Sequence, residues 1–536
     1  MWPQNYSPVG GSLLWSTAVA ALPILVLLFA IGIARVSAWK ASVIGLGAAL
    51  IVAIAGYRMP VHLALSATAY GGAFGAFPIF WIVYWAIVLY RLTVETGKFE
   101  ILKDSIGHLT NDRSLQALLI AFAFGAFLEG AAGFGTPVAV AAAILAGLGF
   151  RPFFAATICL LANTAPVAFG SIGIPLVTLN ATTGIPLRDL SANVGRLVAP
   201  VSLFIPAYLV LVMGGRKELR RVWPAAAVCG LSFAAVQFAV SNFVGPYLTD
   251  ILASLFSIVS IVLLLRFWSP DYDAEPAGAA LTRYTKREIV SAWIPYIALV
   301  VFVLLWSLTG VKAILNRVTF SFAWPGLHNF VLQLPPVTTH AAPYAAMYKV
   351  DWLAASGTSC AISVIVASAL LGVGPLRLFR ICATTARQML PAFISFVAVL
   401  ALAFVMNYCG ATATLGLAFS SVGHIFPFFS ALLGWLGVFL TGSDTSSNAL
   451  FGNLQRITAQ HLSLNPALMA AANSSGGVMG KMISLQSIAV ASAATGMNPD
   501  DEPKLFRFTL RHSIFLAAII GVLSMIYAYA VPGWTR

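Results

Sequence analysis

Long, unbroken apolar runs dominate the chain, and each run is bounded by charged or turn-forming residues. An α-helix rises 1.5 Å per residue and needs about 20 apolar residues to cross about 30 Å of hydrocarbon. The pattern therefore predicts about twelve membrane-spanning helices, near residues 12–34, 38–57, 74–93, 153–182, 191–214, 222–242, 247–266, 291–311, 351–373, 391–410, 465–496 and 512–532. An outer-membrane β-barrel is excluded, because its strands would show alternating apolar positions over about ten residues.

Two further apolar stretches, 115–149 and 427–459, are interrupted near their middles by small and polar residues. The interruptions read EGAAGFGTP at 129–137 and TGSDTSSN at 441–448. Each half holds about 15 residues, too few to cross the bilayer, so we predict two re-entrant hairpins. Backbone left unpaired at such a tip is tolerated only where it is buried in protein or lines a watery cavity.

The two halves of the chain match each other weakly at an offset of roughly 310–316 residues. GAFLEG at 125–130 corresponds to GVFLTG at 437–442, and ANTAP at 162–166 corresponds to ANSSG at 472–476. We therefore predict three parts: a first repeat at 1–214 with hairpin 115–149, connecting helices and a cytoplasmic loop at 215–290, and a second repeat at 291–536 with hairpin 427–459.

The second repeat is expected to be inverted, because five crossings followed by two connecting ones make it enter from the opposite side. Inverted repeats with breaks in corresponding segments are typical of secondary transporters whose site lies near the midplane. The alternative is a duplicated scaffold that transports nothing. The expected fold class is thus an all-α polytopic membrane protein.

Composition supports the membrane assignment, since 60% of the 536 residues are hydrophobic and only 9% are charged. The net charge of +13 is explained by Lys and Arg in cytoplasmic loops rather than by nucleic acid, provided that both termini lie outside. The N-terminus shows no cleavable signal pattern. Five single cysteines without Cys-x-x-Cys spacing indicate neither a metal site nor a disulfide framework, and we expect no cofactor.

Among 17 acidic residues, only Glu129 and Asp444 are expected deep inside apolar stretches, each at a hairpin tip. A buried carboxylate in a membrane helix has a functional role by default, because its insertion costs about 2.5–3.5 kcal/mol. The alternative is that these carboxylates cap backbone N–H groups.

Polar residues near the two hairpins and the two ANxx strings predict four half-helices that begin near the midplane. Thr136 before Pro137 is typical of a helix N-terminus, as is Asn163 or Thr164 before Pro166. Half-helix N-termini attract small anions. The expected substrate-binding residues are Gly133, Gly135, Thr136, Asn163, Thr164, Ser443, Thr445, Ser446, Asn473, Ser474, Ser475 and Lys481.

Two of these expectations have alternatives. The glycines allow the backbone to approach a ligand, but glycine also serves tight helix packing in membranes. Lys481 lies in an otherwise apolar segment and could pair with the substrate, with Asp444 or with Glu129.

Three strings resemble the lactate permease family of bacterial inner-membrane carriers: GAFLEGAAGFGTPVAVAAAILAGLGF at 125–150, LLANTAPVAFGSIGIP at 160–175 and TGSDTSSNALFGNLQ at 441–455. The resemblance implies proton-coupled uptake of L-lactate, often with D-lactate and glycolate. It also implies kinship with carboxylate transporters thought to move as elevators. The tips depart from the Ser-Asn-Thr pattern of sodium-coupled members.

The sequence therefore predicts a symporter of protons and 2-hydroxymonocarboxylates in the bacterial inner membrane, with Glu129 or Asp444 carrying the proton. A sodium-coupled transporter of another small carboxylate is the alternative, and a channel stays open. The motifs of intramembrane proteases and ATP-driven pumps do not occur. The oligomeric state is open, a homo-oligomer included.

Overall fold

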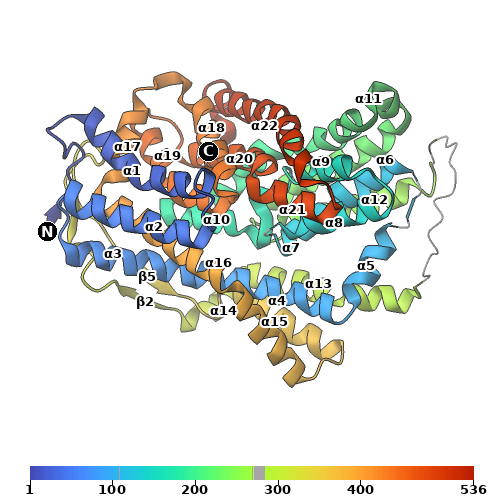
Figure 1. Cartoon of the computed structure of the whole chain (residues 1–536). Helices are drawn as coiled ribbons and strands as arrows, with labels where there is room; N and C mark the ends of the chain where they lie inside the picture. Colours follow the sequence, from blue (N-terminus) through green and yellow to red (C-terminus); the bar gives the residue numbers. More distant parts are fainter. Residues whose placement is uncertain (108, 111, 134, 269, 271–283, 536) are drawn as a thin grey trace.

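The computed structural model describes residues 1–107, 109–110, 112–133, 135–268, 270 and 284–535, and most of these are helical (Figure 1). Helices satisfy every backbone N–H and C=O group internally, which apolar surroundings require. Helices from both halves intermingle, because α10 of the first half packs against α19 of the second, and α1 packs against α18.

The described residues of the first half form twelve α-helices and four short π- or 3₁₀-helical segments. In chain order these are α1 (Leu13–Gly32), α2 (Ala38–Ile51), η1 (Val52–Gly56), α3 (Val61–Phe74), η2 (Gly75–Phe80), α4 (Trp81–Glu95), α5 (Lys98–Gly107), α6 (Arg113–Gln116), η3 (Ala117–Phe124), α7 (Gly125–Ala131), α8 (Thr136–Gly147), α9 (Pro152–Ala162), η4 (Val167–Phe169), α10 (Gly170–Thr183), α11 (Leu187–Phe243) and α12 (Thr249–Leu264).

The second half continues the helical pattern from α13 onward. Its segments are α13 (Lys286–Ser307), α14 (Thr309–Leu315), η5 (Asn316–Val318), α15 (Ser356–Leu370), α16 (Pro375–Cys409), α17 (Ala411–Ser420), η6 (Gly423–Ile425), α18 (Phe426–Thr441), α19 (Asp444–His461), α20 (Pro466–Gly480), η7 (Lys481–Ile483), α21 (Leu485–Thr495), η8 (Pro499–Asp501), α22 (Glu502–Met525), η9 (Ile526–Ala530) and η10 (Pro532–Thr535).

Nine helices in the described ranges are long and apolar enough to cross a membrane, or eleven if each of two bent pairs is one span. They differ in detail from the expected crossings. The apolar helix around α3 and α4 runs from Val61 to Glu95, and α16 begins at Pro375 rather than near residue 391. The predicted span begins later than α16 does because the first part of this helix carries three arginines, Arg377, Arg380 and Arg387.

Short strands modify the all-α expectation. β1 (Trp2–Pro3) pairs in parallel with β3 (Val331–Gln333), and β3 pairs antiparallel with β4 (Ala342–Pro343). β2 (Phe320–Ala323) and β5 (Met347–Val350) form a separate antiparallel pair. These strands lie in the polar connection between α14 and α15 and at the N-terminus, where the chain has no apolar run of spanning length.

The first interrupted stretch folds back on itself, because α8 packs against η3 and α7. Its two ends meet: the guanidinium carbon of Arg113 lies 5.7 Å from the ring centroid of Phe150. The tip turns through Gly133 and Gly135, whose φ angles are 62° and 82°. The incoming arm, Arg113–Ala131, has 19 residues, so the expectation of about 15 residues in each arm is wrong for this hairpin.

The second interrupted stretch is also a helical hairpin, in which α18 and α19 pack together across a turn at Gly442 and Ser443. Its arms are again longer than expected, with 16 residues in α18 and 18 in α19. Both interrupted stretches are therefore helical hairpins whose arms pack together, and the outgoing arm of the first, α8, has 12 residues.

Two helix pairs are sharply bent. The axis turns by 62° between α9 and the η4–α10 segment, and by 43° between α20 with η7 and α21. These breaks fall in corresponding segments of the two halves. The first break, at residues 163–166, includes Asn163 and Thr164, whereas the second lies beyond Asn473–Ser475, which are inside α20.

The meeting of the first hairpin's ends predicts that Arg113→Cys and Arg151→Cys react with an impermeant thiol reagent from the same side of the membrane. Both side chains are exposed. The measurement uses a chain whose five native cysteines are replaced, and Arg188→Cys, beyond the next bent pair, serves as the opposite-side control. Labelling of positions 113 and 151 from opposite sides would mean that the segment crosses the membrane.

Candidate functional site

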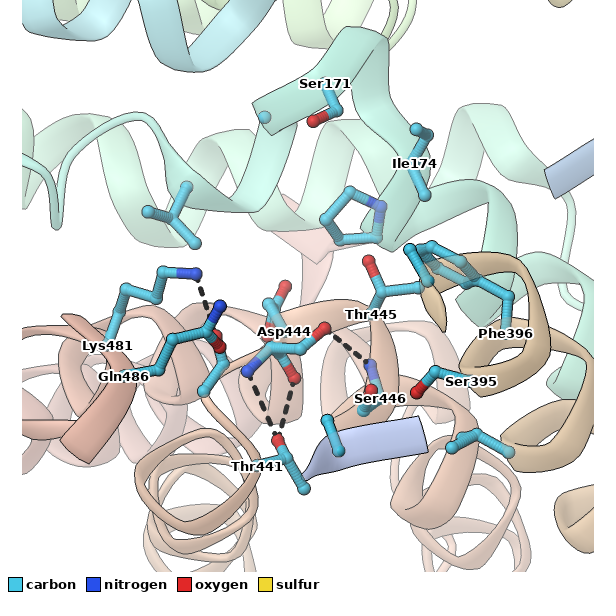
Figure 2. A pocket seen from close by; sticks show the side chains of 18 of the residues that line it. Ser171, Ile174, Ser395, Phe396, Thr441, Asp444, Thr445, Ser446, Lys481 and Gln486 are labelled. Atoms are coloured by element: carbon cyan, nitrogen blue, oxygen red, sulfur yellow. Dashed lines mark hydrogen bonds between the residues drawn. The ribbon is translucent and has the colours of Figure 1, made fainter. Parts of the chain in front are cut away.

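A cavity of about 320 Å³ lies where the second hairpin tip, α10, α2 and α16 converge. In Figure 2, Ser171 and Ile174 of α10 form one wall, Thr441, Asp444, Thr445 and Ser446 of the second hairpin face them, and Ser395 and Phe396 of α16 close one side. Glu129 of the first hairpin, Lys481 and Gln486 also line it. The cavity therefore joins both hairpins and both bent pairs.

The N-terminus of α19 opens into this cavity. Ser443 caps it, with its Oγ accepting a hydrogen bond from the Ser446 N–H at 3.2 Å. The hydroxyls of Thr445 and Ser446 line the cavity, and neither forms a side-chain hydrogen bond within the described residues. Exposed N–H groups and the positive end of a helix dipole favour an anion at such a position.

The start of α10 is the second helix end at the cavity. Ser171, Ile172 and Gly173 all have left-handed φ angles, of 47°, 58° and 75°. The Ser171 hydroxyl donates to the Ala132 carbonyl at 2.9 Å, which ties this turn to the tip of the first hairpin. Such conformations cost about 1–3 kcal/mol each in non-glycine residues and cluster at functional sites.

Asp444 is the centre of a buried hydrogen-bond network. Its Oδ2 accepts from the Ser474 hydroxyl at 2.6 Å and from the Asn448 amide at 3.2 Å. The same amide donates to the Pro175 carbonyl of α10 at 3.2 Å. One carboxylate thus links α19, α20 and α10, while its Oδ1 atom is buried without a partner.

The network extends away from the cavity through side-chain amides. Asn473 donates to Asn448 Oδ1 at 3.0 Å, and Gln455 donates to Asn473 Oδ1 at 3.1 Å. Asn473, Ser474 and Ser475 are fully buried and do not line the cavity. The side chains of Asn473 and Ser474 hold the second hairpin against α20, whereas the Ser475 hydroxyl has no partner among the described residues.

Glu129 enters the cavity from α7 and is only 4% exposed. Its Oε2 atom has no hydrogen-bond partner. A Cβ atom at Gly170 would lie 2.6 Å from Glu129 Oε1, so any larger residue there would push the carboxyl group aside. Neither Glu129 nor Asp444 takes part in an ion pair in the part of the chain that the structure describes.

Lys481 lies just after α20 and donates to the Gly442 carbonyl at 2.8 Å. Its charge is near enough to act on both Glu129 and Asp444. Figure 2 shows the ammonium group at the rim of the cavity beside the hairpin tip. A cation in this place can attract an anion while it satisfies a carbonyl at the tip.

The remaining predicted residues lie behind the cavity wall. Asn163 and Thr164 are buried at the break after α9, where the Thr164 hydroxyl donates to the Leu161 carbonyl at 2.7 Å. Gly133, Gly135 and Thr136 form the first hairpin tip outside the lining. Gly135, not Thr136, is the N-cap of α8, because its left-handed φ starts the helix one residue earlier than expected.

Two predicted helix starts are wrong. After α9 the next helix begins at Gly170 rather than near Pro166, since a 3₁₀ turn at Val167–Phe169 intervenes. In the second half the new helix begins after Ser484, whose Oγ accepts from the Ser487 N–H at 3.2 Å. Ser484, just after Lys481-Met-Ile, is the sequence signal for this start, whereas the predicted start is at Asn473–Ser475, directly before Gly476 and Gly477.

Those glycines serve packing instead. A Cβ at Gly476 would lie 2.1 Å from the Ala431 carbonyl, and one at Gly434 would lie 1.8 Å from the Asn473 carbonyl. Helices α18 and α20 therefore touch backbone to backbone, which only glycine allows. The sequence interpretation also missed four cavity or network residues, namely Asn448, Ser171, Ser395 and Gln486.

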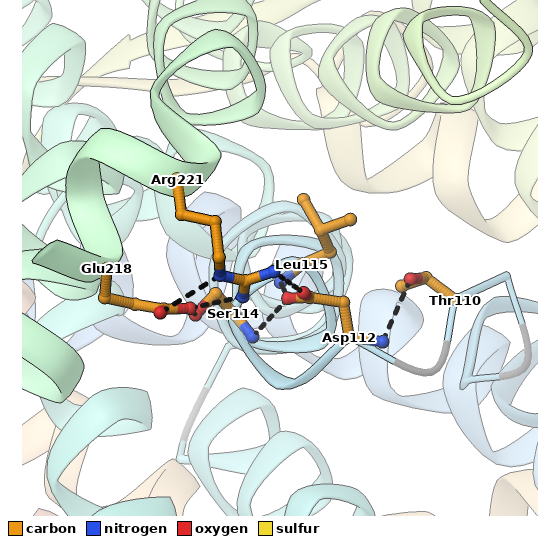
Figure 3. Close-up of polar contacts among 6 residues, drawn as sticks. All are labelled: Thr110, Asp112, Ser114, Leu115, Glu218 and Arg221. Atoms are coloured by element: carbon orange, nitrogen blue, oxygen red, sulfur yellow. Dashed lines mark hydrogen bonds and ion pairs between the residues drawn. The ribbon is translucent and has the colours of Figure 1, made fainter. Parts of the chain in front are cut away.

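The base of the first hairpin is fixed by charges (Figure 3). Asp112 caps α6 by accepting from the N–H groups of Ser114 and Leu115 at 2.9 and 3.0 Å. Its other oxygen pairs with Arg221 at 2.6 Å, and Arg221 pairs with Glu218 at 2.5 Å. Glu218 also accepts from the Ser114 hydroxyl at 2.5 Å. The hairpin that carries Glu129 is thus attached to the middle of α11.

Comparison with known proteins gives a consistent result. The profile of a family described as L-lactate permease matches residues 16–531. The chain is 44% identical to glycolate permease GlcA of Escherichia coli (strain K12), with 99% of each covered. It is 41% identical to an L-lactate permease of Bacillus subtilis (strain 168), over 99% of this chain and 100% of the relative. Among solved structures, Neisseria gonorrhoeae MtrF is similar over 87% of this chain and 84% of its own, at 14% identity and a TM-score of 0.45.

The charged base of the first hairpin predicts a pH-dependent stability. The hydrogen bond from Arg221 holds the pKa of Glu218 below its ordinary value of 4.5. A carboxyl group with a lowered pKa stabilises the folded state above pH 4.5, and this stabilisation is lost as the pH falls through the lowered pKa. Glu218→Gln should therefore reduce the thermal unfolding midpoint at pH 7 by about 1–2 °C, a small effect because the pair is partly exposed.

The difference between Glu218→Gln and the parent should shrink as the pH falls below 4.5. Thermal unfolding in detergent at several pH values measures it. Glu95→Gln, which removes an exposed carboxylate at the end of α4, is the matched control. A difference that stays constant from pH 7 to pH 3 would show that the charge of Glu218 does not stabilise the hairpin base.

Proposed function

Because the chain belongs to the L-lactate permease family, we propose that it takes up L-lactate and related 2-hydroxymonocarboxylates, such as D-lactate and glycolate, together with protons. The cavity is the observation that carries this proposal. It is small, and hydroxyl groups, an ammonium group and two carboxyl groups converge on it from both hairpins. The names of the relatives, lactate and glycolate permeases, support the same substrate class.

The second hairpin tip is the proposed seat of the substrate. Lys481 and the N-terminus of α19 would attract the carboxylate, and the free hydroxyls of Thr445 and Ser446 would contact the 2-hydroxy group. Ser443 would act through its cap. Asn473 and Ser474 would contribute by holding Asn448 and Asp444 in place. Ser475, whose buried hydroxyl has no partner among the described residues, would reach the substrate only when the hairpins move.

The first hairpin tip and the α9 break are the proposed second half of the seat. Asn163 and Thr164 at the break, and Gly133, Gly135 and Thr136 at the tip, would reach the substrate when the hairpins move. Asn163 has an unpartnered, buried amide nitrogen, which supports a role beyond packing.

Transport would proceed by movement of the hairpin-bearing elements against α2 and α16, which form the opposite wall of the cavity. The corresponding bends in the two halves support two inverted repeats, 1–214 and 291–536, joined by 215–290. We place the protein in the bacterial inner membrane with both termini outside, on the basis of the Lys and Arg distribution.

Glu129 is the proposed proton carrier. It lines the cavity with an unpartnered Oε2, whereas Asp444 Oδ2 accepts two hydrogen bonds and so suits a fixed charge. An arriving anion favours the protonated acid, so that proton and lactate cross the low-dielectric barrier as a neutral pair.

Glu129→Gln imitates the protonated acid at nearly constant shape. In proteoliposomes we expect this variant to exchange labelled lactate within about threefold of the parent but to accumulate at least about tenfold less lactate under a pH gradient. Glu95→Gln is the control for loss of an exposed carboxylate. Undiminished accumulation by Glu129→Gln would show that Glu129 does not carry the proton and would make Asp444 the next candidate. Accumulation by the parent under a sodium gradient alone would show sodium coupling instead of proton coupling.

The second hairpin tip should recognise the 2-hydroxy group of the substrate. Propionate lacks this hydroxyl, so it should compete with labelled L-lactate at least about tenfold more weakly than lactate itself, because it leaves buried polar groups unpaired. Thr445→Val should reduce the difference in competition between lactate and propionate. Thr412→Val, on α17 away from the cavity, should leave this difference unchanged. Equal competition by propionate and lactate in the parent would show that the hydroxyl is not recognised.

A further inference from the structure

Four buried side chains at the cavity wall and behind it each have one polar atom without a hydrogen-bond partner in the part of the chain that the structure describes. These atoms are Glu129 Oε2, Asn163 Nδ2, Gln237 Oε1 and Asp250 Oδ2. The residues are between 0% and 5% exposed and come from α7, the end of α9, α11 and α12. Unpaired polar atoms in such surroundings are costly, so a group of four makes this region a candidate site for a proton and the water that would carry it.

The four side chains lie next to one another. Gln237 Nε2 donates to the Ala165 carbonyl at 3.0 Å and lies 3.5 Å from Asp250 Oδ1. A Cβ atom at Gly130 would lie 3.0 Å from the Cβ of Asp250, which places Asp250 directly beside the hairpin that carries Glu129. The charge of Glu129 is near enough to act on Asp250, and Asn163 lies within hydrogen-bonding reach of the Glu129 carboxyl group.

Asp250 did not stand out in the sequence, where it begins an apolar run after a turn. The structure makes it 1% exposed, so the expectation that only Glu129 and Asp444 are deeply buried is wrong. Unlike Glu129, Asp250 does not line the cavity. It lies one layer further from the proposed substrate.

The surroundings of the two carboxyl groups contain few other charges. The segments η3, η4, α8 and α10 that pack against α7 or α12 have no titratable residue in their ranges. At the level of Asp250, α11 presents the neutral Gln237, while α9 contributes Cys159. Lys481 and Asp444 face Glu129 from across the cavity.

Two carboxylates in one buried site cannot both be ionised without a cation between them. We propose that Glu129 and Asp250 form a proton-holding pair, in which Asp250 is a second site for the transported proton. The proton leaves an oxygen of one carboxyl group as it binds to an oxygen of the other, through water held by the four unpartnered atoms. This inference rests on the proposed proton coupling. It adds Asp250 as the group that binds the proton when Glu129 does not.

Asp250→Asn tests the pair in proteoliposomes that contain the full-length chain. The amide oxygen can still accept from Gln237, so the fold is preserved. Removing the like charge makes Glu129 easier to ionise, so the pH for half-maximal net lactate uptake should fall by about one unit. Asp250→Glu should keep the parent profile. The matched control is Ser254→Ala, since Ser254 lies one turn further along α12 and its hydroxyl bonds only the Ile251 carbonyl of its own helix.

If Asp250→Asn has the same pH profile of lactate uptake as the parent, the proposed proton-holding pair is wrong. An inactive variant is resolved by infrared difference spectra recorded on addition of L-lactate. A protonated-carboxyl band present in the parent and absent in Asp250→Asn supports the proposal, and an unchanged band overturns it. The proposed function fails separately, if the parent shows no uptake driven by a pH gradient.

Discussion

The hydrogen bonds of Asp444 are the interaction on which the centre of the molecule depends. A single buried carboxylate joins the start of α19 to Ser474 of α20 and, through Asn448, to the Pro175 carbonyl of α10. These three elements belong to both halves of the chain. The backbone of the adjoining turn is satisfied separately, because Lys481 donates to the Gly442 carbonyl and the Ser443 N–H donates to the Thr441 hydroxyl. Each such backbone group left unpaired in apolar surroundings would cost several kcal/mol.

The two hairpins are anchored by different physical means. The first is fixed at its base, where Asp112, Arg221 and Glu218 form ion pairs near the aqueous edge, and its tip is held by the Ser171 hydroxyl. The second is fixed along its length, by glycine packing against α20 and by the buried amide network. The cavity lies between a hairpin whose base is held by ion pairs and a hairpin that packs along its length against α20.

Much of this arrangement follows from the sequence. Runs of apolar residues locate most spans, and the interruptions at 129–137 and 441–448 locate both hairpin tips, because polar residues in such runs need a special environment. Ser443 was recognisable as a cap by its spacing to Ser446. The break in the second half could not be located from the sequence, because Gly476 and Gly477 are compatible with either a break in the helix or a close contact between two helices. Only the position of α18 decides between them. Asp250 was missed for a similar reason, because its burial depends on α7, which is distant in sequence.

The contact between α18 and α20 constrains how the protein can change shape. Backbone atoms meet at Gly434, Gly476 and Gly480, where a single added methyl group would overlap a carbonyl oxygen. No side chain is present there that could change rotamer and let one helix slide or swing past the other. The second hairpin and α20 are therefore packed as one rigid piece, so the movement that we propose for transport would have to open the cavity at its other wall, which α2 and α16 form.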